Sequence, residues 1–135
     1  MEVLVRYASA AQKAKYLQPL LEGSTRSCFA MTEPNVASSD ATNIATRIER
    51  DGDQYVINGR KWFASNAYHP DLAFYILMGR SRDEGPSHGR HSQILIDADT
   101  PGIRKLRWIP VLGYSDLPRG HGEIQFCLLY TSRCV

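Results

Sequence analysis

Residues 44–57 read Ile-Ala-Thr-Arg-Ile-Glu-Arg-Asp-Gly-Asp-Gln-Tyr-Val-Ile, and this stretch decides the fold. From Ile44 to Glu49, side chains suited to a core alternate with side chains suited to solvent, which predicts a half-buried strand. The triplet Asp51-Gly52-Asp53 is typical of a hairpin turn, and Tyr55–Ile57 predicts the returning strand. The chain therefore contains β-structure from about residue 44 onward.

Downstream, the same alternation of short strands and turn signals continues. Asn58-Gly59 predicts a second turn, and Leu72–Gly79 is a near-continuous apolar run typical of a buried strand. Further strands are predicted at Ser92–Ala98, Ile103–Leu112 and Glu123–Phe126. Short strands at regular spacing predict an antiparallel β-barrel or sandwich.

Upstream, the pattern is helical. Residues 2–7 are typical of the end of a helix or of a short buried segment, and Ser9 with Gln12 forms a capping-box pattern at the start of a helix. Pro19 is expected to end this helix near Leu17 and to open another turn, which Gly23 closes. Short N-terminal helices followed by an antiparallel β-barrel or sandwich make the expected fold class α+β.

Composition excludes several classes of protein. The 135 residues carry a net charge of +2 with basic and acidic residues interspersed, so no nucleic-acid partner is expected. No apolar run is long enough for a membrane span, and Met1–Leu4 lacks the layout of a signal peptide. Three cysteines without a CxxC motif predict no disulfide framework and favour a reducing compartment. The loop His88–His91 lacks partners at ligand spacing, so no metal site is expected.

The last nine residues, 127–135, have an unusual origin in our interpretation. They back-translate to TGT CTC TTA TAC ACA TCT AGA TGT GTA, in which the last nine bases are the reverse complement of the preceding TACACATCT. This is the end sequence of a transposase-based sequencing adapter. We therefore predict that residues 127–135 are a translated adapter tail and that the chain is a fragment; the alternative is a genuine strand, since Leu-Leu-Tyr-Thr suits β-structure.

Two segments carry the candidate chemistry. Residues 28–40 read Cys-Phe-Ala-Met-Thr-Glu-Pro-Asn-Val-Ala-Ser-Ser-Asp, and residues 59–67 read Gly-Arg-Lys-Trp-Phe-Ala-Ser-Asn-Ala. Both place backbone amides and small hydroxyls beside aromatic side chains, which suits a flat ring system with polar edges. Taken singly, each has an ordinary structural alternative: Thr32–Asn35 is also typical of a turn, and Trp62 and Phe63 are also typical of a strand.

Taken together, the two segments resemble the signatures of the acyl-CoA dehydrogenase family. Met31–Pro34 with Ser39-Asp40 resembles MTEP-x-x-GSD, and Gly59–Ala67 resembles GxKxWITNA. The resemblance covers the chain up to Phe126 and is closest to the branch called family members ten and eleven. It implies that residues 1–23 end an N-terminal helical domain and that residues 24–126 form most of the middle β-barrel domain, which binds flavin and acyl-CoA.

The resemblance also implies a role for each site residue. Phe29, Met31 and Thr32 match residues that lie against the isoalloxazine ring of FAD, and Thr32 with its backbone matches a hydrogen-bond partner of the pyrimidine edge. Ser65 stands where the family usually has Thr, at flavin N5, and Phe63 stands where it usually has Trp. Ser39 matches the serine at the acyl-CoA thioester, although this chain has one extra residue between Pro34 and Asp40.

The function that the resemblance implies is α,β-dehydrogenation of acyl-CoA to trans-2-enoyl-CoA by an FAD-dependent oxidoreductase. The catalytic base is expected in a C-terminal domain outside this chain, so Glu33 is interpreted as structural and the chain alone as inactive. An electron acceptor such as an electron-transferring flavoprotein, a homo-oligomer, and a bacterial cytoplasmic or mitochondrial matrix location are further expectations. His121 and Arg119 are candidates for the CoA entrance. The alternatives are a fragment of an acyl-CoA oxidase or related flavoenzyme, and a non-catalytic β-barrel binding module.

Overall fold

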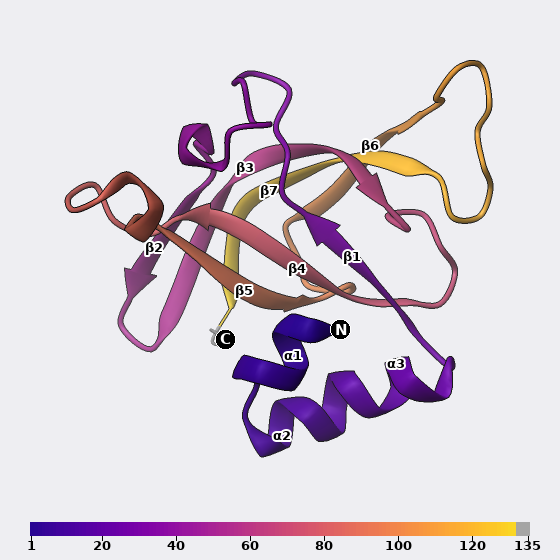
Figure 1. The fold of residues 1–135 in the computed structure, drawn as a ribbon, viewed down its shortest axis with the longest axis horizontal. Helices are drawn as coiled ribbons and strands as arrows, with labels where there is room; N and C mark the ends of the chain where they lie inside the picture. Colours follow the sequence, from indigo (N-terminus) through magenta and orange to yellow (C-terminus); the bar gives the residue numbers. More distant parts are fainter. Residues whose placement is uncertain (132–135) are drawn as a thin grey trace.

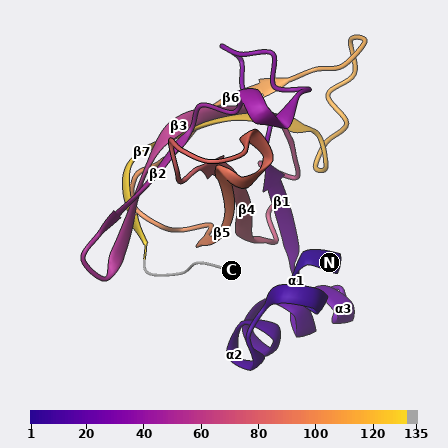
Figure 2. The same ribbon diagram turned by 60° about the vertical axis from the view of Figure 1, so that its left-hand side comes forward.

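The computed structural model describes the backbone of residues 1–131 and the side chains of residues 1–127. Figures 1 and 2 show a curled sheet with a group of short helices packed together on one side of it. The expected α+β class is confirmed. The prediction that residues 127–135 are an adapter tail stays a prediction: the backbone through Thr131 continues the last strand, and residues 132–135 lie outside the described part of the chain.

The helical segments follow one another almost without a break. The capping box at Ser9 is confirmed, because its hydroxyl accepts the Gln12 N–H and the Gln12 side chain accepts the Ser9 N–H. Pro19 does not interrupt the helical path, since it lies in the first turn of a helix, where its missing N–H removes no intrahelical bond. The segments are α1 (Glu2–Tyr7), α2 (Ala10–Gln12), the π-helix η1 (Lys13–Leu17), and α3 (Gln18–Glu22).

The described strands form one sheet in the order β1-β4-β2-β3-β7-β6, with β5 paired to β4 outside this path. Four of the six strand pairs are antiparallel, as predicted, while β4 runs parallel to both β1 and β2, so the sheet is mixed. The strands are β1 (Arg26–Ala30), β2 (Arg47–Asp51), β3 (Gln54–Ser65), β4 (Leu72–Arg80), β5 (His91–Asp97), β6 (Ile103–Ile109) and β7 (His121–Thr131). Short 3-10 turns η2 (Ala41–Asn43) and η3 (Ser87–Gly89) lie in the loops.

The predicted turn at Asn58-Gly59 is wrong. β3 runs without a turn from Gln54 to Ser65, and its register against β7 shifts between Ile57 and Gly59. Glycine is required at position 59 by close packing against Thr46 and not by a turn. A Cβ at this position would lie 2.2 Å from the Thr46 hydroxyl oxygen. The strand predicted from Ile44 likewise starts only at Arg47. The glycine that suggested a turn is therefore present because the backbone at residue 59 packs closely against Thr46.

Two buried clusters flank the sheet. The larger fills the concave side, and its members include Cys28, Ile57, Tyr75 and Phe126. The smaller lies between the helices and the other face of β4 and β5, where Leu4, Tyr16 and Leu17 pack with Phe74, Ile76 and Leu95. The helices are thus held to the sheet by their own apolar core.

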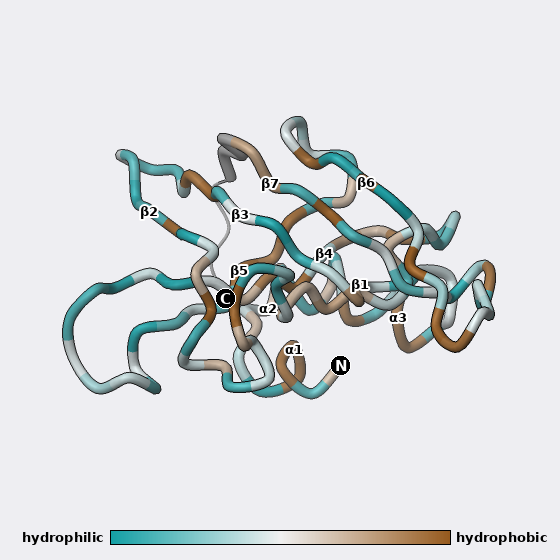
Figure 3. The backbone as a smooth tube through the Cα atoms, turned by 90° about the horizontal axis from the view of Figure 1, so that it is seen from above, coloured by the Kyte–Doolittle hydropathy of each residue, from teal (hydrophilic) through white to brown (hydrophobic). Residues whose placement is uncertain are grey.

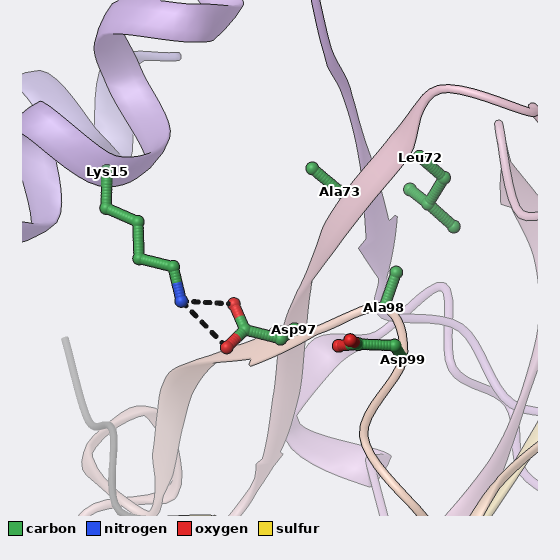
Figure 4. A pocket seen from close by; sticks show the side chains of 6 residues that line it. All are labelled: Lys15, Leu72, Ala73, Asp97, Ala98 and Asp99. Carbon is green, nitrogen blue, oxygen red and sulfur yellow. Dashed lines mark hydrogen bonds and ion pairs between the residues drawn. The ribbon is translucent and has the colours of Figure 1, made fainter.

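A polar contact reinforces this helix–sheet packing. Lys15 Nζ lies 2.8 Å and 2.9 Å from the two carboxylate oxygens of Asp97, whose Oδ1 also accepts a hydrogen bond from the Tyr16 hydroxyl. Figure 4 shows Lys15 reaching from the helix to Asp97 at the end of β5, beside a hollow that Leu72, Ala73, Ala98 and Asp99 also line. Because Lys15 forms an ion pair with Asp97, we interpret this hollow as a structural junction between the helix and the sheet.

Candidate active site

The exposed face of β1 forms the first half of the candidate site. Cys28 and Ala30 point into the larger core, while Phe29 between them is 44% exposed. Phe29 pairs in register with Ile76, whose side chain packs against the helices, so Phe29 lies on the helix-bearing face of the sheet. Met31 directly follows the last residue of β1 and is partly buried.

The end of β3 forms the second half. Phe63 is 44% exposed and has a φ of 49°, a left-handed conformation that is uncommon for a bulky residue. The register of β3 against β7 shifts between Lys61 and Ala64, which is a β-bulge at this point. Asn66 follows with a φ of 66°. Bulges and strained backbone both turn side chains away from the regular sheet, and here they present Phe63 and Ser65 to the surface.

Hydrogen bonds hold these two halves together. The Trp62 N–H donates to the Thr32 carbonyl at 3.0 Å, and the Thr32 hydroxyl donates to the Trp62 carbonyl at 2.8 Å. The Asn66 side-chain amide donates to the Ser27 carbonyl at 3.1 Å. The structure therefore brings five of the six predicted site residues to one region: Phe29, Met31, Thr32, Phe63 and Ser65.

Ser39, the sixth predicted residue, lies in the turn that follows Pro34 and is exposed. No hydrogen bond in the described part of the chain links it to Phe29 or Phe63. Its neighbour Ser38 is buried instead, where its hydroxyl accepts the Glu33 N–H at 2.8 Å. Of the two serines in this turn, Ser38 is thus buried and Ser39 is open to solvent.

His121 extends the candidate site beyond β3. Its Nδ1 lies 3.1 Å from the Ser65 hydroxyl oxygen, and its ring centroid lies 6.0 Å from that of Phe63. It also lines a hollow of about 520 Å³ with Val111, Tyr114, Ser115 and Asp116, beneath the long β6–β7 loop that projects from the sheet in Figure 1. The sequence indicated a loop residue here and not a partner of Ser65, since the pairing of β7 with β3 decides this contact.

The buried acidic side chain of the first signature segment, Glu33, is already paired. Glu33 is 5% exposed, and its carboxylate accepts hydrogen bonds from Lys61 Nζ and from the N–H groups of Ala45 and Thr46, each at 2.8 Å. Burial opposes ionisation of Glu33, but the hydrogen bonds from Lys61 and Thr46 outweigh it and place its pKa below the ordinary value of 4.5. Burial lowers the pKa of Lys61 despite the nearby carboxylate. The Glu33 carboxylate is thus buried and fully paired, and its structural role stays a prediction.

A second buried carboxylate lies on the outer face of β7. Glu123 is fully buried, and its two oxygens lie 2.5 Å from Nε of Arg60 and Nε of Arg107. Burial opposes its ionisation, but the hydrogen bonds from the two arginines hold the pKa of Glu123 below its ordinary value. Figure 3 shows hydrophilic colour along much of β6, which carries Arg104, Lys105 and Arg107. Both Glu33 and Glu123 are therefore buried carboxylates paired with cationic side chains.

Residues 1–131 hold neither a metal-binding cluster nor a membrane-spanning helix. They contain no group of three or more His, Cys, Asp or Glu side chains placed to hold a metal ion. None of their helices is both long and apolar enough to cross a membrane.

Comparison with known proteins decides the family. The family model described as "Acyl-CoA dehydrogenase, middle domain" matches residues 28–127, which contain both signature segments. The chain belongs to the acyl-CoA dehydrogenase family. This match runs from the middle of β1 to the middle of β7, so the fold described above is that of an acyl-CoA dehydrogenase middle domain.

Relatives in several organisms agree with this assignment. Over 126 residues, 93% of this chain, it is 53% identical to the "Probable acyl-CoA dehydrogenase IBR3" of Arabidopsis thaliana, of which it spans 15%. It is 51% identical to the human "Acyl-CoA dehydrogenase family member 11" and spans 16% of that protein. The predicted branch is thereby confirmed, and the chain spans less than a third of the length of these acyl-CoA dehydrogenases.

Solved structures show the same architecture. A putative acyl-CoA dehydrogenase from Mycobacterium abscessus superposes with a TM-score of 0.94 at 46% identity over 98% of this chain and 33% of its own. A structure titled "PigA with FAD and proline" superposes with a TM-score of 0.84 at 29% identity, again over 98% of this chain and 33% of its own. The acyl-CoA dehydrogenase fold of this chain is therefore found in experimental structures, one of them named for bound FAD.

Proposed function

We propose that this chain forms the flavin-facing and thioester-facing half of an FAD-dependent acyl-CoA dehydrogenase that converts an acyl-CoA to the trans-2-enoyl-CoA. The observation that carries the proposal is the pair of exposed rings, Phe29 and Phe63, on two segments joined through Thr32 and Trp62. Exposed aromatic rings beside polar groups form a surface complementary to a flat ring with polar edges. The residues present therefore fit an isoalloxazine ring.

Each residue has a definite task in this proposal. Phe29 and Phe63 contact the ring faces and exclude water from them, and Met31 fills the space between them. The Thr32 backbone N–H donates to the pyrimidine edge, because the Thr32 hydroxyl is already used by the Trp62 carbonyl. The Ser65 hydroxyl would face the central edge of the ring, and Ser39 would contact the thioester arm of the acyl-CoA. When bound, FAD supplies a hydride acceptor, which this chain's own side chains do not provide.

The base that removes the α-proton of the acyl-CoA comes from outside this chain in our proposal. Glu33 and Glu123 are both buried and paired, so neither reaches a ligand. Asp116 lines the hollow beside His121. Replacing Asp116 therefore tests whether the base lies outside this chain. The contribution of this chain is then positioning and electrostatic stabilisation. The electron acceptor, such as an electron-transferring flavoprotein, and the oligomeric contacts would involve the rest of the protein.

A titration of the ¹⁵N-labelled chain with FAD, followed by NMR, tests the proposed flavin site, because it detects weak binding residue by residue. We expect the largest amide shifts at Phe29, Met31, Thr32, Phe63 and Ser65. Dispersed amide signals before addition of FAD establish that the chain is folded. A folded chain whose amides do not shift at millimolar FAD, or shift only around the Lys15–Asp97 junction, would contradict the proposal.

An activity assay on the same sample tests the missing base. With FAD, butyryl-CoA and a dye as electron acceptor, the chain should reduce no dye above background. Turnover that disappears in the variant Asp116→Asn would show that the base lies within this chain and that our assignment is wrong.

A further inference from the structure

Lys61 is the most unusual side chain near the candidate site. It lies on the core-facing side of β3, is 0% exposed, and sits opposite Ile124 of β7. Its ammonium donates at 2.7 Å to the Met31 carbonyl and at 2.8 Å to Glu33 Oε1. One buried cation thus binds two residues of the first signature segment, thirty and twenty-eight positions away in the sequence.

Glu33 is itself held firmly in place. Its two oxygens accept the N–H groups of Ala45 and Thr46, and its own N–H donates to the Ser38 hydroxyl. The carboxylate therefore has a fixed position, and it fixes the Lys61 ammonium in turn. A charged pair with this many satisfied hydrogen bonds has a defined geometry.

Stability alone does not account for such a pair. Removing both charges from water is costly, and buried ion pairs replaced by apolar residues of similar volume are often equally or more stable. A role in setting geometry is the better explanation, and the Met31 carbonyl is the atom whose geometry is set. It belongs to the peptide group that joins Met31 to Thr32.

The Met31–Thr32 peptide group transmits this contact to the site. In a trans peptide the carbonyl and the following N–H point in opposite directions. Because Lys61 holds the Met31 carbonyl toward the buried ammonium, the Thr32 N–H points away from it. Among the described residues, no hydrogen-bond acceptor receives this N–H. It is therefore available as a donor to a ligand.

We propose that Lys61, fixed by Glu33, is a positioning residue that aims the Thr32 N–H at the pyrimidine edge of the bound flavin by holding the Met31 carbonyl. This inference rests on the proposed flavin site. It adds that the buried Lys61–Glu33 ion pair, which joins the two signature segments, fixes the direction of the Thr32 N–H. The aromatic residues alone then do not align the flavin.

The test compares the wild-type chain with the double variant Lys61→Met/Glu33→Gln, which removes both charges and so leaves neither buried alone. We expect FAD to bind about tenfold more weakly to the double variant, the effect of one lost hydrogen bond. The FAD-induced NMR shift should disappear at Thr32 and persist at Phe63. The control is Ile94→Ala, which opens a cavity in the same core and should lower the melting temperature without weakening FAD binding.

Outcomes separate the inference from the proposed function. If FAD shifts no amide of the folded wild-type chain, the proposed function fails. If FAD binds the wild type and the double variant equally, with the Thr32 shift retained in both, the flavin site stands and the role of Lys61 is overturned. Should the double variant not fold, Lys61→Arg keeps the charge for Glu33 but not the ammonium geometry at Met31, and the same weakening is expected.

Discussion

The hydroxyl oxygen of Ser65 lies 3.1 Å from Nδ1 of His121, across the junction between β3 and β7. The two residues are an opposed pair in the antiparallel ladder, so the contact follows from strand register. The imidazole also lies beside the ring of Phe63. The hydroxyl proposed to face the flavin therefore has a fixed partner on the neighbouring strand, and that partner limits how the hydroxyl can rotate.

The Ser65 hydroxyl should contribute to flavin binding. We expect Ser65→Ala to raise the Kd for FAD about fivefold, because one hydrogen bond to the ring is lost. Ser65→Thr should bind FAD as the wild type does, since it keeps the hydroxyl. Quenching of flavin fluorescence measures both constants. Ser92→Ala is the matched control: its hydroxyl pairs with Ser81 away from the site, and FAD binding should not change. Equal binding by all four proteins would remove Ser65 from the site.

The Glu33–Lys61 pair should make the chain sensitive to acid. Because the pKa of Glu33 is lowered on folding, its ionised form adds stability above pH 4.5, and this stability is lost as the pH falls through the folded-state pKa. Burial lowers the pKa of Lys61, so the Lys61 ammonium itself disfavours folding at low pH and cannot supply the stability that Glu33 adds. We expect the free energy of unfolding to fall less steeply between about pH 5 and pH 3 in Lys61→Met/Glu33→Gln than in the wild type. Urea unfolding at several pH values measures this, and parallel curves would contradict it.

Much of the fold could be predicted from local patterns. The capping box at Ser9, the left-handed Gly23 and the apolar strand from Leu72 all depend on residues close in sequence, and the structure confirms them. Pairing between distant strands could not be predicted in the same way. The parallel pairing of β1 with β4 joins residues about 46 positions apart, and no short-range signal indicates it.

The same limit applies to the site. The two signature segments indicated Phe29 and Phe63 directly, because aromatic residues within a motif are visible in the sequence. The contact of His121 with Ser65 depends on the β3–β7 register, and the role of Lys61 depends on which face of β3 is buried. Lys61 lies two residues after the partly buried Gly59 and two residues before the exposed Phe63 in β3. A lysine at a core-facing position of a strand is the signal that could have indicated its role.

The two arginines above Glu123 should be more important for stability than the charge of Glu123 itself. Arg60 and Arg107 are 47% and 62% exposed, whereas the Glu123 side chain is 1% exposed. Replacing both arginines by methionine leaves a buried carboxylate unpaired, which should cost about 3–5 kcal/mol. Glu123→Gln leaves two arginines that water can reach, and its cost should be about 1 kcal/mol. Urea unfolding at pH 7 compares the two variants, and the reverse order would show that the arginines are not the partners that stabilise Glu123.

The close contact between Gly59 and Thr46 predicts the effect of adding one methyl group. A Cβ at residue 59 would lie 2.2 Å from the hydroxyl oxygen and 2.6 Å from the Cβ of Thr46, so β2 and β3 would have to separate. We expect Gly59→Ala to lower the free energy of unfolding by about 1–3 kcal/mol, the usual range for overpacking. Gly89→Ala is the control, because the nearest atom to its added Cβ is 4.0 Å away. If Gly59→Ala were as stable as Gly89→Ala, the close approach of Thr46 would not be what requires glycine at position 59.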